Sequence, residues 1–208
     1  MKVQHVRGIG LVEIMVTVVV LGIIAAVAAP SFTDMLNRRR VEAVANSITT
    51  DLAFMRTEQS AHPSEIDLQV NSDPTGKQMS CYAIYVPNSQ FTCDCTNVAK
   101  VCSPKFGSST LDPLIRAEQT PASTKVSYAA FSAGAVLPAG KFFKYDTARL
   151  IPSPADMYFD ICGSPKSSTR PILRVEFNDA GRARICSPNS SMGGYGSCTA
   201  PVAAPQCP

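Results

Sequence analysis

The chain has 208 residues, of which 45% are apolar and 17% are charged, and its formal net charge is +3. This composition excludes a disordered or collagen-like chain, and the length suits one domain or one domain with an appendage. The two histidines, His5 and His62, lie far apart in the sequence, which excludes a multi-histidine metal site. A serine or cysteine nucleophile would have to use His62 as its general base. The sequence also lacks G-x-S-x-G, H-E-x-x-H and Walker motifs. We therefore expect no enzymatic activity, no cofactor and no metal site.

The chain begins with a short basic segment, residues 1–8, followed by an apolar block. Residues 9–29, 21 in all, are apolar, Gly or Thr with the single exception of Glu13. As a helix, this block would span roughly 30 Å, the thickness of a bilayer core. A secretory signal peptide, cleaved near residues 26–28, and a plain membrane anchor both fit this length. Neither makes use of Glu13, whose charge costs about 2.5–3.5 kcal/mol at the centre of a bilayer.

The residues around this carboxylate resemble a known processing signal. The stretch Arg7–Val16, RGIGLVEIMV, resembles the class III signal of type IV prepilins and pseudopilins. The resemblance implies that a prepilin peptidase cuts between Gly8 and Ile9 and N-methylates the new terminus, although phenylalanine is commonest at that position. It implies that Glu13, fifth in the mature chain, pairs with the terminal amine of a neighbouring pilin subunit. The protein would be a single-pass inner-membrane protein with a cytoplasmic N-terminus and a periplasmic head, which later joins an extracellular pilus.

An amphipathic stretch continues the apolar block. Pro30 would kink a helix, but no Gly or Pro interrupts residues 31–61. Within this stretch, apolar residues recur every three or four positions, which is typical of one buried helix face. These residues are Val41, Val44, Ile48, Leu52 and Met55. The pattern predicts one long helix over residues 9–61, with a membrane-spanning half (9–30) and an amphipathic half (31–62).

Beyond Pro63 the sequence changes to short β-prone runs bounded by Pro, Gly, Asn, Asp and Ser. The strands that we expect are residues 66–70, 82–86, 125–128, 157–161 and 172–177. Because no helical stretch separates them, they predict an antiparallel sheet, and the amphipathic half of the helix would cover one face of it. We therefore expect an α+β fold, with a long N-terminal helix packed on an antiparallel β-sheet head formed by residues 63–208. The prepilin resemblance implies the same pilin-like architecture.

All eight cysteines lie in the expected head, at positions 81, 93, 95, 102, 162, 186, 198 and 207. An exported head would pair them as disulfides, although the sequence does not determine their connectivity. Proximity in the sequence favours Cys162 with Cys186 and Cys198 with Cys207, each closure contributing about 2–4 kcal/mol. The segment 93–102 superficially resembles a metal knuckle, but its spacing fits no C-x-x-C pair, and we expect no zinc there.

A segment near the C-terminus predicts a basic hairpin. Residues 172–177 and 182–186 form strands on either side of turn residues 178–181. Period-two alternation places Arg182 and Arg184 on one face, roughly 6.8 Å apart, a spacing that suits two phosphates of a nucleic-acid backbone. Alternatively, the two arginines are ordinary solvent-facing residues that discourage edge pairing. Other basic residues nearby are candidate members of the same patch: Lys166, Arg170 and Arg174.

Two stretches resemble the FimT/GspH family of type IV minor pilins and pseudopilins: residues 51–58, DLAFMRTE, and residues 181–184, GRAR. FimT-like members carry a C-terminal Gly-Arg-x-Arg motif that is linked to DNA binding in natural transformation. The resemblance therefore implies a minor pilin that assembles into or primes the pilus and binds extracellular DNA, independently of sequence, through Gly181, Arg182 and Arg184. The alternative is a type II secretion pseudopilin of the GspH type, which needs no DNA binding.

Overall fold

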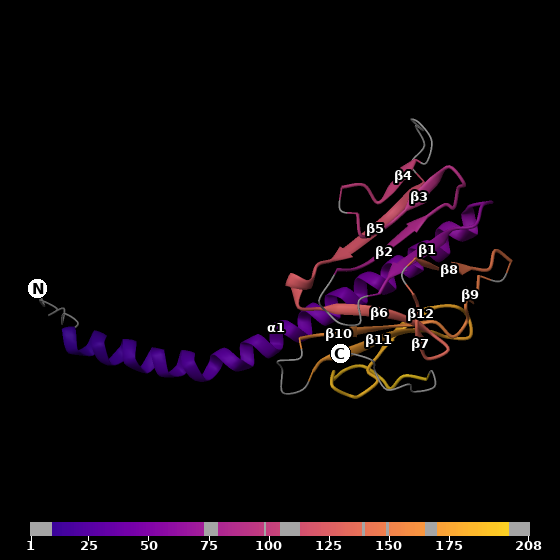
Figure 1. Cartoon of the computed structure of the whole chain (residues 1–208). Helices are drawn as coiled ribbons and strands as arrows, with labels where there is room; N and C mark the ends of the chain where they lie inside the picture. Colours follow the sequence, from indigo (N-terminus) through magenta and orange to yellow (C-terminus); the bar gives the residue numbers. More distant parts are fainter. Residues whose placement is uncertain are drawn as a thin grey trace, which may run out of the picture. The chain divides into compact units, whose positions relative to one another are not determined.

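The computed structural model describes residues 10–72, 79–97, 99–104, 113–138, 140–148, 150–164 and 170–199, without the side chains of residues 27–30 and 141–142. The predicted leader, which ends at Gly8, and Ile9 lie outside these residues. Two compact units make up the chain, residues 1–36 and residues 37–208. The helix α1 (Leu11–Ala61) has 51 residues and continues through the boundary between them (Figure 1). The single long helix expected from the sequence is therefore confirmed.

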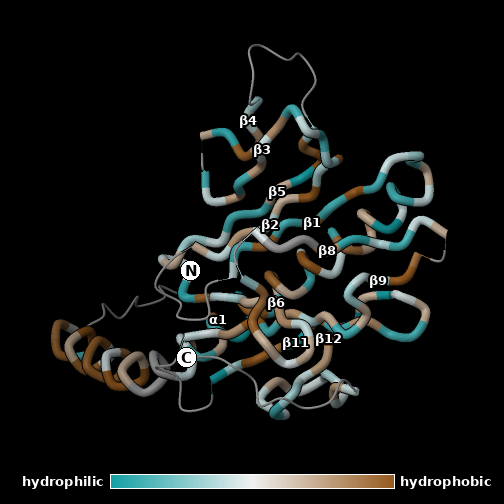
Figure 2. Tube along the Cα trace, turned by 45° about the vertical axis from the view of Figure 1, so that its right-hand side comes forward, coloured by the Kyte–Doolittle hydropathy of each residue, from teal (hydrophilic) through white to brown (hydrophobic). Residues whose placement is uncertain are grey.

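From Leu11 on, the described part of the first unit is helical and mostly hydrophobic (Figure 2), and its apolar side chains are exposed. The helix bends between Ala26 and Ser31, where Pro30 removes a backbone donor, as the sequence predicts. Among the described residues, neither Leu11–Ala26 nor Ser31–Ala61 alone is long and apolar enough to cross a bilayer, whereas the bent pair together could do so by length and composition. The exposed large apolar residues of this unit are Leu11, Val12, Ile14, Met15, Val16, Val18, Val19, Val20, Leu21, Ile23, Ile24, Phe32, Met35 and Leu36.

The second unit contains two five-stranded antiparallel sheets and a two-stranded hairpin. The first sheet has the order β5-β2-β1-β8-β9 and the second has the order β12-β11-β10-β6-β7. The strands are β1 (Asp67–Asn71), β2 (Ser80–Tyr85), β3 (Phe91–Cys93), β4 (Cys102–Pro104), β5 (Leu114–Thr120), β6 (Ser127–Ser132), β7 (Ala135–Val136), β8 (Lys141–Tyr145), β9 (Pro152–Ser153), β10 (Tyr158–Cys162), β11 (Ile172–Phe177) and β12 (Ala183–Cys186), with a 3-10 turn η1 (Ala122–Thr124) before β6. The chain thus has the expected α+β fold. All five expected strands are present and begin within two residues of their predicted starts, but they belong to two sheets and not to one.

The second half of α1 lies against both sheets and forms the main core with them (Figure 1). Its buried face is the predicted stripe, with Ala45 fully buried and Val44 only partly buried. Alternate residues of the central strands meet this face, and these include Leu68, Ile84, Phe159 and Val175. Burying each such side chain contributes about 1.5–3 kcal/mol, so this interface is a major source of stability for the unit.

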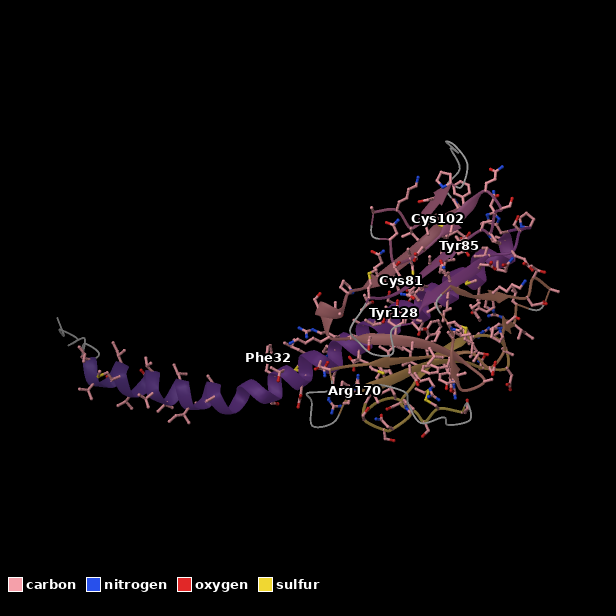
Figure 3. All side chains as sticks on the ribbon, viewed as in Figure 1. Phe32, Cys81, Tyr85, Cys102, Tyr128 and Arg170 are labelled. Carbon is pink, nitrogen blue, oxygen red and sulfur yellow. A yellow bond between two sulfur atoms is a disulfide. The ribbon has the colours of Figure 1, made fainter. Side chains whose placement is uncertain are left out.

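A second, smaller core forms on the opposite face of the first sheet, where the β3–β4 hairpin packs on β2. Two disulfides hold this lobe together, Cys81–Cys95 and Cys93–Cys102, and Tyr85 is buried beside them (Figure 3). Because β2 is covered on both faces, all six of its residues are buried. The four sulfur atoms are bonded in pairs and offer no thiolate to a metal ion, so the resemblance of this segment to a metal knuckle has no chemical basis.

The remaining cysteines correct the predicted pairing. Cys186 is bonded to Cys198, which excludes both Cys162–Cys186 and Cys198–Cys207. Strand order explains why Cys162 and Cys186 do not pair, because β11 lies between β10, which carries Cys162, and β12, which carries Cys186. Two strand spacings amount to about 9.5 Å, beyond the roughly 7 Å that a disulfide can bridge. Cys162 is also disulfide-bonded, and Cys207 lies outside the described residues.

Candidate functional site

The hairpin expected near the C-terminus is present as β11, a turn and β12. Asn178 organises the turn, because its side-chain oxygen accepts hydrogen bonds from the backbone N–H of Ala180 (3.1 Å) and of Arg182 (2.9 Å). Gly181 has a φ of +71°, and a Cβ at this position would lie 2.5 Å from the carbonyl oxygen of Leu150. Only glycine therefore fits the last position of the turn, residues 178–181, and this fixes the backbone from which the Arg182 side chain extends.

Arg174 is not available to a nucleic acid, and the prediction that it binds DNA is wrong. It is fully buried in β11 opposite Asp160 of β10, and its Nε and Nη2 donate to the two carboxylate oxygens at 2.6 and 3.0 Å. The ring of Tyr158 lies 4.0 Å from the guanidinium carbon. The pair is on the face of the second sheet that points away from α1, which we call the outer face, and the register between the two strands brings its charges together.

Arg184 is held by a carboxylate as well. It pairs across the strands with Glu176, which accepts hydrogen bonds from its Nε, at 2.9 Å, and from its Nη2. The backbone N–H and the hydroxyl of Thr199 donate to the same carboxylate oxygen, and Thr199 follows the Cys186–Cys198 bond directly. The Glu176 side chain is 1% exposed and that of Arg184 is 41% exposed, so Arg184 is accessible but its charge is balanced by a buried partner.

The other predicted basic residues do not extend a patch around the turn. Arg170 is half-buried, and its Nε donates to the carbonyl of Gly163 at 2.8 Å; burial lowers the pKa of its guanidinium (Figure 3). Lys166 lies outside the described residues. Of the predicted DNA-binding side chains in the described part of the chain, Arg182 is therefore the one that is exposed and without a carboxylate partner.

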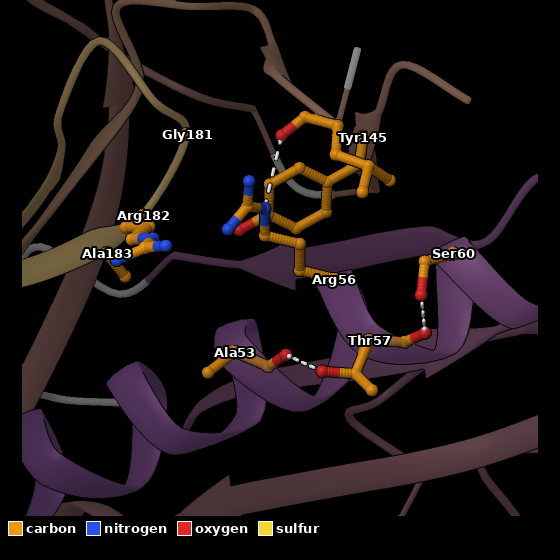
Figure 4. Close-up of a pocket in the computed structure, with 9 residues that line it drawn as sticks. Ala53, Arg56, Thr57, Ser60, Tyr145, Gly181, Arg182 and Ala183 are labelled. Carbon is orange, nitrogen blue, oxygen red and sulfur yellow. Dashed lines mark hydrogen bonds between the residues drawn. The ribbon is translucent and has the colours of Figure 1, made fainter. Parts of the chain in front are cut away.

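A cavity of about 480 Å³ opens beside Arg182, between the end of α1 and the hairpin turn (Figure 4). Its lining is Ala53, Arg56, Thr57, Ser60, Tyr145, Leu150, Gly181, Arg182 and Ala183. This lining contains two arginines and no carboxylate. The arrangement can bind an anionic group, since two guanidinium ions at one cavity favour negative charge.

Arg56 lines this cavity but was not among the candidate residues predicted from the sequence. It extends from α1 into the cavity (Figure 4), where its Nε donates to the backbone carbonyl of Leu150 at 3.4 Å. Its Nη2 donates to the backbone carbonyl of Ala180 at 3.0 Å. Carbonyl groups orient the guanidinium but leave its positive charge unbalanced. Burial raises the pKa of Tyr145 at the base of the cavity and the charge of Arg56 lowers it, the first effect being larger, so the phenol stays neutral.

The helix segment 51–58 also fixes the helix on the first sheet. Asp51 is fully buried and accepts a hydrogen bond from the Tyr82 hydroxyl at 2.6 Å, while the Nε of Arg116 lies 2.9 Å from its other oxygen. Burial and this carboxylate raise the pKa of the Tyr82 hydroxyl, which keeps it protonated as a donor. The segment that carries the family resemblance therefore contacts the first sheet through Asp51 and lines the cavity through Arg56.

Glu13 lies in the first turn of α1, exposed among apolar side chains. Its backbone N–H donates to the carbonyl of Gly10 at 3.0 Å. No residue in the described part of the chain pairs with its carboxylate, and the neighbouring positions Gly8 and Ile9 lie outside that part.

Solved structures of pilus and secretion proteins resemble the backbone of this chain over about three quarters of its length. The type IV minor pilin FimU of Pseudomonas aeruginosa is 16% identical, with a TM-score of 0.43 over 74% of this chain and 92% of FimU. A second crystal form of FimU is 18% identical, with a TM-score of 0.42 over 73% of this chain and 99% of FimU. The minor pseudopilin EpsH from the type II secretion system of Vibrio cholerae is 13% identical, with a TM-score of 0.37 over 74% and 99% of the two chains. No protein-family model and no curated protein matches the sequence.

Proposed function

We propose that this protein is a minor type IV pilin, a filament subunit that is anchored by its N-terminal helix and presents residues 63–208 as its head. The observation that carries the proposal is Glu13, the one carboxylate among positions 11–26 of α1, where every apolar side chain is exposed. Such a surface needs a bilayer or neighbouring helices to cover it. A charge within it needs a partner of opposite sign.

The partner that the prepilin resemblance supplies is the terminal amine of an adjacent subunit, created when a prepilin peptidase cuts between Gly8 and Ile9. At about 4 Å and an effective dielectric constant near 20, this pair would contribute on the order of 4 kcal/mol before desolvation is subtracted. The inner membrane would hold the subunit before assembly, with residues 9–30 spanning it and the head in the periplasm. Glu13 would then select the register at which a subunit enters the filament.

A Glu13→Ala variant tests this proposal. We expect it to be processed like the parent, because the cut after Gly8 is unchanged, but to be depleted at least tenfold from sheared filaments relative to the membrane fraction, as measured by immunoblotting. Glu42→Gln is the matched control, since Glu42 lies on the same helix beyond the apolar block and pairs there with Arg39. Intact mass should show the loss of residues 1–8. Normal entry of Glu13→Ala into filaments, or the loss of 28 or 29 residues, would contradict the proposal.

A second function is supported by the exposed, unbalanced charge of Arg182 at the head. We propose that the head binds extracellular DNA through its phosphates for uptake in natural transformation. The affinity should be independent of sequence and should fall steeply with salt. The test is fluorescence anisotropy of a labelled 30-base-pair duplex with the full chain in detergent. Arg182→Gln should weaken binding about tenfold, and Arg40→Gln, an exposed arginine elsewhere on α1, should not. No binding by the parent chain would favour the type II secretion pseudopilin.

A further inference from the structure

The cavity at the hairpin turn joins two arginines that are 126 positions apart in the sequence, Arg56 and Arg182. We infer that these two side chains together hold one backbone phosphate of DNA, and that Arg184 does not take part. The inference rests on the proposed DNA binding and identifies the group that the DNA contacts. The sequence predicted that Arg182 and Arg184, two residues apart in the hairpin, contact phosphates. The inference assigns this role to Arg56 of the helix and Arg182 of the turn.

The charge balance of the cavity supports this assignment. Nε and Nη2 of Arg56 donate to the carbonyls of Leu150 and Ala180, and its Nη1 is left to donate to a ligand. Because both carbonyls are uncharged, the positive charge of Arg56 is not balanced by them. Nothing in the described part of the chain accepts a hydrogen bond from the side chain of Arg182. The positive charges of Arg56 and Arg182 repel each other at the cavity. A bound phosphate would offset this repulsion and accept hydrogen bonds from both guanidinium groups.

The way in which Arg56 is held also favours binding. Its guanidinium is fixed in place by the two carbonyls before any ligand arrives, so little side-chain entropy remains to be lost. The turn that carries Arg182 is fixed by Asn178 and Gly181. The helix and the turn are therefore tied together by the contact between Arg56 and Ala180, and the ligand meets a site that is already formed.

The size and the walls of the cavity fit a phosphodiester and its sugar. A volume of about 480 Å³ is within the range of small-molecule sites. Ala53, Leu150 and Ala183 provide apolar surface beside the arginines, which suits a deoxyribose ring. No base edge is needed for such a contact, so binding would position the duplex without reading its sequence.

Arg184 is excluded by its partner. Its Nε and Nη2 donate to Glu176, and the negative charge of that carboxylate, which is 1% exposed, offsets the positive charge that would attract a phosphate. Arg56 and Arg182 have no such neighbour, because no carboxylate lines their cavity.

The experiment compares single variants of the full chain in detergent by anisotropy with the same 30-base-pair duplex at several salt concentrations. Arg56→Gln and Arg182→Gln should each weaken binding about tenfold and lower the slope of log affinity against log salt by about one. Arg184→Gln and Arg40→Gln should stay within twofold of the parent; Arg40 lies sixteen residues from Arg56, roughly 24 Å along the helix. Arg56→Lys keeps the charge but loses the guanidinium that the two carbonyls orient, so it should recover part of the affinity that Arg56→Gln loses and keep the salt dependence of the parent.

The outcomes separate the inference from the proposed function. If Arg182→Gln weakens binding and Arg56→Gln does not, DNA binding stands and the shared phosphate is wrong. Equal losses for Arg184→Gln and Arg182→Gln would overturn the inference in favour of a contact along one strand. If Arg56→Lys weakens binding as much as Arg56→Gln and both unfold at lower temperature, Arg56 only positions the turn, which also overturns it. If none of these variants changes the affinity, the DNA-binding proposal itself fails.

Discussion

The outer face of the second sheet and the cavity at the hairpin turn use the same residue type in opposite ways. On the outer face, Arg174 and Arg184 are each bonded to a carboxylate that is almost fully buried. At the cavity, Arg56 and Arg182 have no carboxylate partner in the described residues. Three of these arginines lie within eleven residues of one another. The difference shows that position on the strand, and not the local density of basic residues, decides whether an arginine stabilises the fold or stays available to a ligand.

The geometry of the hairpin explains the division. The outer face of β11 and β12 carries Arg174, Glu176 and Arg184, because side chains two residues apart on a strand share one face. On this face the strand register places Arg174 opposite Asp160 and Arg184 opposite Glu176. Arg182 precedes β12 and belongs to the turn, so it has no cross-strand carboxylate. The charges of the outer face are therefore paired across strands, whereas Arg182, which precedes β12, has no cross-strand carboxylate.

The largest effect that this comparison predicts is at Arg174. Arg174→Ala should reduce the free energy of unfolding by about 3–5 kcal/mol, because it leaves the Asp160 carboxylate buried without its partner. Urea unfolding of the full chain in detergent, followed by circular dichroism, measures this change. The double variant Arg174→Met with Asp160→Leu is the control and should recover most of the loss, since it removes both charges. A loss below 1 kcal/mol in Arg174→Ala would mean that the outer face is open to water.

Much of the fold could be predicted from the sequence because its signals are local. The stripe on α1 and the five apolar strands depend on spacings of three, four and two residues, and all appear in the structure. The division into two sheets could not be predicted. Strand β5 carries Arg116 and Glu118, which mask its alternation, and Arg116 is accommodated there by Asp51 of the helix. That contact exists only after the chain has folded.

The candidate site could be predicted only in part, for the same reason. The positions of Gly181 and Arg182 at the hairpin turn could be predicted, because the turn residues and the Gly-Arg-x-Arg motif are both local sequence patterns. Whether Arg174 is paired depends on the strand register that places Asp160, fourteen residues away, opposite it. The position of the Arg56 guanidinium depends on the carbonyl of Ala180, 124 residues away. The order of strands separates Cys162 from Cys186, and Cys186 is bonded to Cys198. Each of these is a tertiary contact that no spacing in the sequence encodes.

The second prediction tests how the outer face is closed. Changing Cys186 and Cys198 together to Ser opens a loop of 12 residues and should cost about 3 kcal/mol. It should also free Thr199 from Glu176, so that limited proteolysis cuts residues 187–199 faster. The matched control replaces Cys81 and Cys95, which are 14 residues apart in the other lobe and should lower stability similarly without exposing this segment. Unchanged cleavage in the first variant would show that the disulfide does not hold the segment.

The third prediction concerns the turn itself. Gly181→Ala should reduce the free energy of unfolding by about 1–3 kcal/mol, because the added Cβ would lie 2.5 Å from the carbonyl oxygen of Leu150 at a φ of +71°. The control is Gly193→Ala, where a Cβ has no neighbour within 4 Å and should change stability by less than about 0.5 kcal/mol. Thermal and urea unfolding of the full chain measure both. Equal stability of the two variants would mean that the turn moves away from Leu150 without cost.

The smallest expected effect is at Arg182, and it completes the comparison with Arg174. Arg182→Gln should change the free energy of unfolding by less than about 0.5 kcal/mol, because an exposed side chain without a partner contributes little to the folded state. The same urea titration that detects the loss in Arg174→Ala measures it. A loss above 1 kcal/mol would show that Arg182 has a structural contact like those of the outer face. In that case reduced DNA binding by this variant would report a damaged fold, and the distinction between structural and available arginines in this hairpin would be lost.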